Sequence, residues 1–215
     1  MRFQQLACGF VMGITTALFA GLVLSQEPEV DPEDSRKQWE KYNTPSESHK
    51  KLKGYEGEWD VVMKLWMDGD GEPMISHGEM DSELIFGGRF LRTDVRAKME
   101  IKYQDGVWEV PFEGLGITGY DTLRKKYVAV WIDNFTNSIS ISEGQHDKSG
   151  KVFTFFGKQD DWMDGVFDKP YKIVDRWVTD DKCISEMYDL TAPPGEGKFL
   201  ELVATRSKST QVQKD

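Results

Sequence analysis

The sequence predicts an all-β protein: an antiparallel meander of about ten strands, closed into a barrel and preceded by a short N-terminal helix. Residues 59–206 divide into strand-like segments, and turn-forming residues separate them. No span after residue 55 shows the apolar period of a helix. An open sheet of this width would leave two edges exposed, and closure into a barrel removes both.

The composition excludes several classes of protein. The chain has 37 acidic and 27 basic residues and a net charge of −10, whereas nucleic-acid-binding proteins usually present a basic face. Two cysteines are too few for a disulfide-rich scaffold or a four-thiolate zinc site. We therefore expect no nucleic-acid partner, no metal and no cofactor.

The first 25 residues are typical of a secretory signal peptide. Arg2 is the only charged residue before Glu27, and an apolar run lies between residues 6 and 24. We expect export to the periplasm or the medium, cleavage near Ser25-Gln26, and no transmembrane segment in the mature chain. An uncleaved anchor is the alternative, because the run approaches the length of about 20 residues that spans a bilayer. Cleavage would leave Cys183 as the only thiol, and we expect it to be buried and inert.

A helical preface precedes the barrel. Residues 26–43 are an acidic linker in which Pro32 and its acidic neighbours favour a helix up to Tyr42. Thr44-Pro45-Ser46-Glu47 predicts a second helix at 45–53, capped by Thr44, which we expect to cover part of one barrel mouth. The barrel domain is expected over 44–207, and residues 208–215 form a C-terminal tail.

Each expected strand is a run of β-forming residues that ends at turn residues. The strands are 59–67, 74–85, 89–101, 107–119, 126–133, 138–143, 152–158, 171–179, 183–190 and 199–206. Pairs such as Asp105-Gly106 and Ser149-Gly150 supply the positive φ that tight hairpins need. Residues 159–170 form the longest expected loop, and its Trp162-Met163 pair is a candidate lid or partner contact.

Two motifs at the ends of the strand region favour closure. Gly57-Glu58-Trp59 opens the first strand, and Thr205-Arg206 closes the last. They resemble the calycin barrels (lipocalins and their relatives), in which a tryptophan caps the barrel bottom and an arginine packs over it. An arginine stacked on an indole gains about 0.5–2 kcal/mol, so we expect Trp59 and Arg206 to hold the barrel closed. The Thr-Asp-Tyr motif of true lipocalins is missing.

Further short motifs follow in order along residues 44–207. They are Gly57-Glu58-Trp59-Asp60-Val61, Gly87-Gly88-Arg89-Phe90-Leu91, Pro111-Phe112-Glu113-Gly114-Leu115-Gly116, Gly119-Tyr120-Asp121, Lys125-Lys126-Tyr127, Val130-Trp131-Ile132-Asp133, Ser142-Glu143-Gly144 and Ala204-Thr205-Arg206. This set resembles the secreted bacterial family named domain of unknown function 1579. The resemblance implies a lipocalin-like barrel and no assigned activity.

Few residues indicate chemistry. Phosphate loops, nucleophile elbows and His-Glu-x-x-His motifs are missing from the sequence. The three histidines, His49, His77 and His146, have no short ligand spacing, and we expect them to be exposed. Arg176 shares a strand face with valines and is a candidate partner of Glu186 on the next strand. Such a pair would anchor a polar ligand head, or it would be structural.

Tryptophans are more numerous than barrel closure requires. Five of them either line a ligand cavity or pack as ordinary core: Trp66, Trp108, Trp131, Trp162 and Trp177. We therefore expect a barrel that binds a small apolar or amphipathic molecule. The candidate ligand-binding residues are Trp131, Arg176, Glu186, Glu143 and Tyr120.

Two other functions stay open. One is an enzyme on the same barrel with Glu143, Asp133 or Tyr120 as the acid or base, and the other is an interaction module with a filled core.

Export gives the first testable prediction. N-terminal sequencing of the protein recovered from its host should begin at or near Gln26, because the apolar run precedes a small-residue cleavage region. Recovery of intact Met1 on membrane-bound protein would support the anchor instead.

Overall fold

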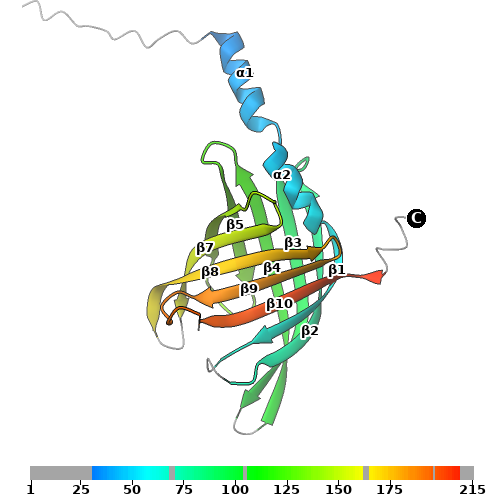
Figure 1. Ribbon diagram of the computed structural model, residues 1–215, viewed down its shortest axis with the longest axis vertical. Coiled ribbons are helices and arrows are strands. Elements are labelled where there is room, and N and C mark those ends of the chain that lie inside the picture. Colours follow the sequence, from blue (N-terminus) through cyan, green and yellow to red (C-terminus); the bar gives the residue numbers. More distant parts are fainter. Residues whose placement is uncertain (1–30, 68–70, 104–105, 162–164, 196, 209–215) are drawn as a thin grey trace, which may run out of the picture. The chain divides into compact units, whose positions relative to one another are not determined.

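The computed structural model describes residues 31–67, 71–103, 106–161, 165–195 and 197–208, and within them ten antiparallel strands close into one barrel (Figure 1). Each strand pairs with its sequence neighbours, and the first pairs with the last. The strands are β1 (Gly57–Leu65), β2 (Met74–Ile85), β3 (Phe90–Tyr103), β4 (Gly106–Asp121), β5 (Lys126–Asp133), β6 (Ser140–His146), β7 (Val152–Asp161), β8 (Val166–Thr179), β9 (Lys182–Asp189) and β10 (Lys198–Arg206). The predicted meander and its closure are confirmed.

The chain divides into two units, residues up to Gln38 and residues from Trp39 onward. Helix α1 (Pro32–Asn43) includes residues of both units, whereas α2 (Glu47–Lys51) and the 3-10 helix η1 (Leu52–Tyr55) lie in the second. No helix in the described part of the chain is long and apolar enough to cross a membrane. The predicted signal peptide and the Trp162-Met163 pair lie outside the described residues.

The start of α2 differs from the prediction. The Thr44 hydroxyl donates to the Glu40 carbonyl at 2.7 Å, so this residue ends α1 and does not cap the next helix. Ser46 is the N-cap, and its backbone N–H donates to Nδ1 of His49 at 2.9 Å. A histidine therefore takes the place expected for a glutamate in the capping box.

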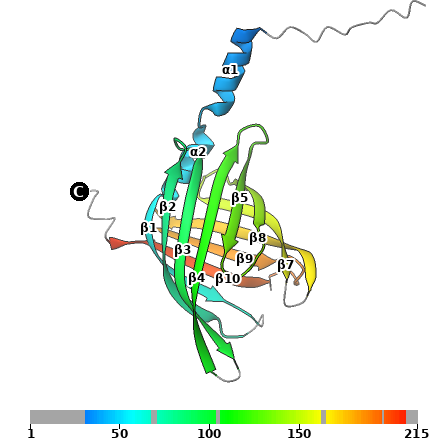
Figure 2. The same cartoon turned by 180° about the vertical axis from the view of Figure 1, so that it is seen from behind.

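Residues of α2 and η1 cover one end of the barrel, as predicted, and Figure 2 shows α2 at this end from behind. The Tyr127 hydroxyl donates to the Ser48 carbonyl at 2.8 Å, and the Trp59 indole donates to the Tyr55 carbonyl at 2.9 Å. Leu52 is fully buried in a cluster with the side chains of β3, β5 and β7. We call this end the capped end and the opposite one the far end.

The predicted loop at 159–170 is wrong, because β7 and β8 continue into it. A β-bulge between Gln159 and Asp161 keeps the two strands paired, and only residues 162–165 separate them. Asp168 follows with a positive φ of 56°. The polar residues here suggested a loop, but Lys169 binds Asp161 across the strand pair at 3.0 Å.

Arg206 and Trp59 join the last strand to the first. They are register partners, and the guanidinium lies 4.1 Å from the indole ring centre. Arg206 is only 7% exposed. It donates to the Glu56 carbonyl and to the Asp181 carboxylate, both at 2.9 Å, so it also ties the cap to the barrel.

Loss of this arginine should destabilise the fold. We expect Arg206→Ala to lower the free energy of unfolding by about 2–4 kcal/mol, because buried carbonyls lose their donor and the indole loses its cation. Arg206→Lys, which keeps the charge without the planar fork, should recover only part of this loss. Denaturant unfolding measures both variants. The double mutant with Trp59→Phe should show coupling, and strictly additive effects would contradict the stacking.

Candidate functional site in the barrel lumen

Alternate residues of each strand face the barrel interior, or lumen. Of the two alternating faces of the strands, the inward one is the face that holds the buried residues. Among the described strands, Val174 is the one buried non-glycine residue on the other face. The inward face includes Trp59 on β1 and Phe153 on β7, and cross-strand register extends it around the barrel. The inward faces are mainly apolar or aromatic.

The inward residues are not all buried. The half-buried inward residues include Thr93, Thr118, Ala129, Trp131, Ile173, Asp175, Ser185, Met187, Leu200 and Leu202. Other inward residues below the cap, among them Met63, Val95, Met99 and Tyr171, are buried, so this part of the inner face is packed in places and partly exposed in others.

Glycines on the wall make room for large rings. A Cβ on Gly114 would lie 2.2 Å from the Trp131 ring, and one on Gly157 would lie 2.5 Å from the Tyr171 ring. Each ring thus lies flat against a neighbouring strand where no side chain intervenes. Trp131 is fixed further by its indole N–H, which donates to Asp133 at 2.9 Å.

Asp175 is the polar group within this interior. It faces inward on β8, between Phe153 on β7 and Ser185 on β9. Ser185 hydrogen-bonds to it, and no ion pair reaches it from the described residues. Burial raises the pKa of its carboxyl to about 6, so it is mostly ionised at neutral pH without a counter-ion.

The Tyr55 hydroxyl lies close to this carboxylate. It is buried and makes no hydrogen bond of good geometry within the described structure. Its neighbours are the Trp177 indole and the Cys183 thiol, and burial with the nearby Asp175 charge raises the pKa of Tyr55. A buried hydroxyl without a partner is costly, so a hydrogen-bond donor placed beside it would stabilise the structure.

A second charged group lies at the far end. Lys169 on β8 contacts Asp161 on β7 and Asp189 on β9, each at 3.0 Å. These hydrogen bonds raise the pKa of Lys169, so it stays cationic. The three side chains are about four-fifths buried and link three strands at the lumen margin.

Two of the predicted ligand-binding residues face the lumen. Trp131 is half-buried, and Ala129 and Thr118 are its inward neighbours. Tyr120 lies at the capped end, with its ring 5.0 Å from Tyr127 and 5.6 Å from the His49 ring. Tyr120 therefore contributes to the closed core.

The other three predicted residues do not face the lumen. Arg176 and Glu186 do form the predicted pair across neighbouring strands, but both have outward register. Glu186 also contacts Lys198 at 3.3 Å. Glu143 is likewise outward and pairs with Lys126. The expected placement of Arg176 or Glu186 as an interior anchor is corrected, because their strand faces carry long basic side chains that favour solvent.

The three candidate acid–base residues are not brought together. Asp133 lies at the far end, where its oxygens accept from Trp131 and from the backbone N–H groups of residues 135 and 136. Tyr120 is inside the capped end, and Glu143 is outside the wall.

Outcomes for the histidines and the remaining tryptophans are mixed. His77 is exposed as predicted, but His49 is buried, and burial and the nearby Arg89 lower its pKa. Trp177 packs on Tyr55 and Trp59, whereas Trp66 lies under the Lys198 ammonium and Trp108 is 55% exposed. Cys183 is buried, as predicted.

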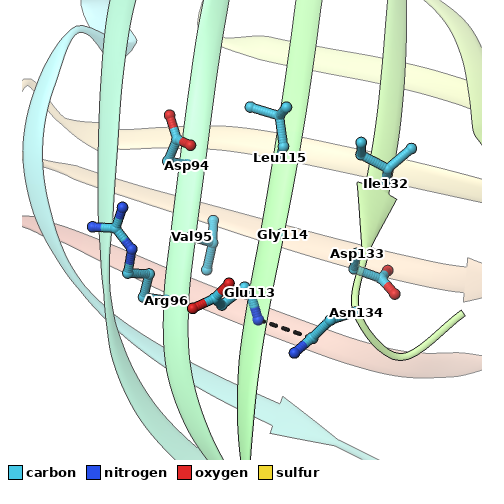
Figure 3. Close-up of a pocket in the computed structure, with 9 residues that line it drawn as sticks. All are labelled: Asp94, Val95, Arg96, Glu113, Gly114, Leu115, Ile132, Asp133 and Asn134. Atoms are coloured by element: carbon cyan, nitrogen blue, oxygen red, sulfur yellow. Dashed lines mark hydrogen bonds between the residues drawn. The ribbon is translucent and has the colours of Figure 1, made fainter.

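The outer wall carries a separate shallow pocket of about 270 Å³ over β3, β4 and β5 (Figure 3). Its lining side chains Asp94, Arg96, Glu113, Leu115 and Ile132 have outward register. The Glu113 N–H donates to Asn134 at 3.0 Å beside it. This pocket is therefore distinct from the lumen.

Sequence reasoning missed Asp175. The signal was available in β8, where Tyr171, Ile173, Asp175 and Trp177 alternate with Lys172 and Arg176. Two long basic side chains on one face indicate the outer face, which leaves the aspartate on the inner one.

The buried carboxyl should make stability depend on pH. A group whose pKa is raised from 3.8 to about 6 on folding binds its proton more tightly in the folded state, so it costs stability as pH rises from about 4 to 6. Asp175→Asn should remove this slope and gain about 1–3 kcal/mol over the wild type at pH 7. Denaturant unfolding across this pH range measures both proteins.

Carboxyls with a lowered pKa, such as Asp189 and Glu201, make stability rise with pH. Both the wild type and Asp175→Asn contain them, so their contribution cancels when the two proteins are compared. Identical slopes in the two proteins would contradict the buried charge.

Three solved β-barrels and one protein family are similar to this chain. A de novo designed fluorescence-activating β-barrel is 11% identical, with a TM-score of 0.39 over 73% of this chain and 96% of that chain. A redesigned β-barrel bound to DFHBI is 13% identical, with a TM-score of 0.35 over 71% and 99%. A further redesigned β-barrel is 13% identical, with a TM-score of 0.35 over 73% and 95%.

No curated protein matches the chain. The model of one family matches residues 44–206, which span nearly all of the barrel and its cap. The resemblance carried by the short motifs is thereby confirmed, and the chain belongs to the family described as Protein of unknown function (DUF1579).

Proposed function

We propose that this chain is an exported barrel that binds a small apolar or amphipathic molecule in its lumen. The observation that carries the proposal is the partial exposure of inward side chains in a closed barrel. On one wall these are Ile173, Met187 and Leu200, and on the other they include Ala129 and Trp131. Small-molecule sites are mostly apolar and pre-formed, with few polar groups that orient the ligand.

The barrel size supports this proposal. Eight strands leave an interior just wide enough for side chains or one small ligand, and a larger strand number widens it. The ten strands here carry glycines opposite Trp131 and Tyr171, which hold these rings against the wall. The capped end is closed by packed aromatic residues, so a ligand would enter from the far end.

Export rests on the N-terminal sequence. The apolar run between residues 6 and 24 follows a single basic residue, and the acidic segment after it suits the exposed start of a mature chain.

A fluorescent probe tests lumenal binding. A neutral naphthylamine dye should bind the protein and quench tryptophan emission, because Trp131 is half-buried on the inner face. Trp131→Ala should weaken binding about tenfold through loss of its ring contact. Trp39→Ala is the matched control, since Trp39 is 65% exposed on α1, and it should leave the affinity unchanged.

A lumen-filling variant covers the case in which Trp131→Ala unfolds. Ala129→Phe should abolish dye binding without loss of the fold, because its ring would occupy the space that the dye needs. Equal dye binding by Ala129→Phe and the wild type would contradict a lumenal site.

A further inference from the structure

We propose that the lumen selects an organic cation, an amine or quaternary ammonium on an apolar body, whose head lies between the Asp175 carboxylate and the Tyr55–Trp177 ring pair. The inference rests on the proposed binding function and deepens it by naming the charge of the ligand. It is carried by the unpaired carboxylate, the unpartnered hydroxyl and the charge of the lumen.

The Asp175 carboxylate lacks a cation. An inward charge in low dielectric without an ion-pair partner destabilises the fold, and the hydrogen bond with Ser185 offsets only part of that cost. The titratable groups beside it are Tyr55 and Cys183. Burial raises the pKa of each, so both stay neutral near pH 7 and neither supplies a positive charge. A cationic ligand would supply it.

The Tyr55 hydroxyl adds a second point of recognition. It is buried without a hydrogen-bond partner in the described structure, and its ring lies 4.7 Å from that of Trp177. The N–H groups of a protonated amine can donate to the carboxylate and to this oxygen together, whereas a quaternary ammonium would interact through its charge alone. Aromatic rings also attract cations, and the attraction grows when water is excluded.

The charge of the lumen excludes an anionic head. Inward carboxylates in the described strands are Asp133, Asp161, Asp175 and Asp189, against the inward cations Lys169 and Arg206. Both cations are already bound, Lys169 by two aspartates and Arg206 by Asp181. A carboxylate ligand would therefore meet repulsion at Asp175 with no free cation to receive it.

The wall below Asp175 fits an apolar body. Ile173, Met187 and Leu200 are half-buried and lie side by side on β8, β9 and β10, one step toward the far end. Asp175 lies six positions after Lys169 on β8, which is about 20 Å along the strand. An alkyl chain or a fused ring system can extend through this interval with its head at the closed end.

Three probes that differ in their head group test the inference. Octylammonium, octanol and octanoate are titrated into the full chain by calorimetry near pH 8, where Asp175 is ionised. Octylammonium should bind at least about tenfold more tightly than octanol, and octanoate should bind weakest. The octylammonium affinity should fall as pH drops through about 6, because protonation removes the charge of the site.

Two variants test whether Asp175 causes the preference for octylammonium over octanol. Asp175→Asn should remove the preference for octylammonium over octanol while octanol binding is retained. Asp168→Asn is the matched control: the residue is on the same strand, its side chain is 76% exposed, and the preference should persist.

The outcomes separate the two proposals. Equal binding of octylammonium and octanol, or a preference that survives in Asp175→Asn, overturns the cation inference and leaves lumenal binding intact. Failure of all three probes contradicts the proposed function itself.

Discussion

Pairing of β1 with β10 is the contact on which the rest of the structure depends. It runs from Trp59–Arg206 to Leu65–Leu200, so it joins residues at opposite ends of the barrel domain. A ring of strands has no free edge, and its interior becomes a separate space only when this last ladder forms. Arg206 strengthens the ladder where it meets the cap, because it contacts the Trp59 ring and the Glu56 carbonyl together.

The same closed wall holds a packed core at one end and a mixture of buried and half-buried inward residues beneath it. At the capped end, Leu52 enters the barrel from η1 and packs with Tyr127 and Phe153 into a core that excludes water. Below it, Trp131 and Tyr171 lie against glycines of neighbouring strands. Asp175 is held in low dielectric near this level, and burial raises the pKa of its carboxyl.

Much of the fold was predictable because its signals are local. Turn pairs mark the hairpins, and the motifs around Trp59 and Arg206 indicate closure. Strand faces were harder, since β8 is apolar enough on both faces that alternation alone does not tell inside from outside. Arg176 was therefore expected inside and is outside, whereas Asp175 was overlooked. The prediction that Thr44 caps α2 was wrong, because its hydroxyl hydrogen-bonds to the Glu40 carbonyl at the end of α1. The spacing of residues does not show which of the two helices the hydroxyl will contact.

A hollow, ligand-accessible lumen is the central claim, and xenon tests it without knowledge of the ligand. Xenon occupies dry apolar cavities in protein interiors. A crystal of the protein pressurised with xenon should show a bound atom inside the barrel, beside Ile173, Met187 and Leu200. A crystal with no xenon in the barrel, and with side chains packed across its axis at this level, would contradict the claim.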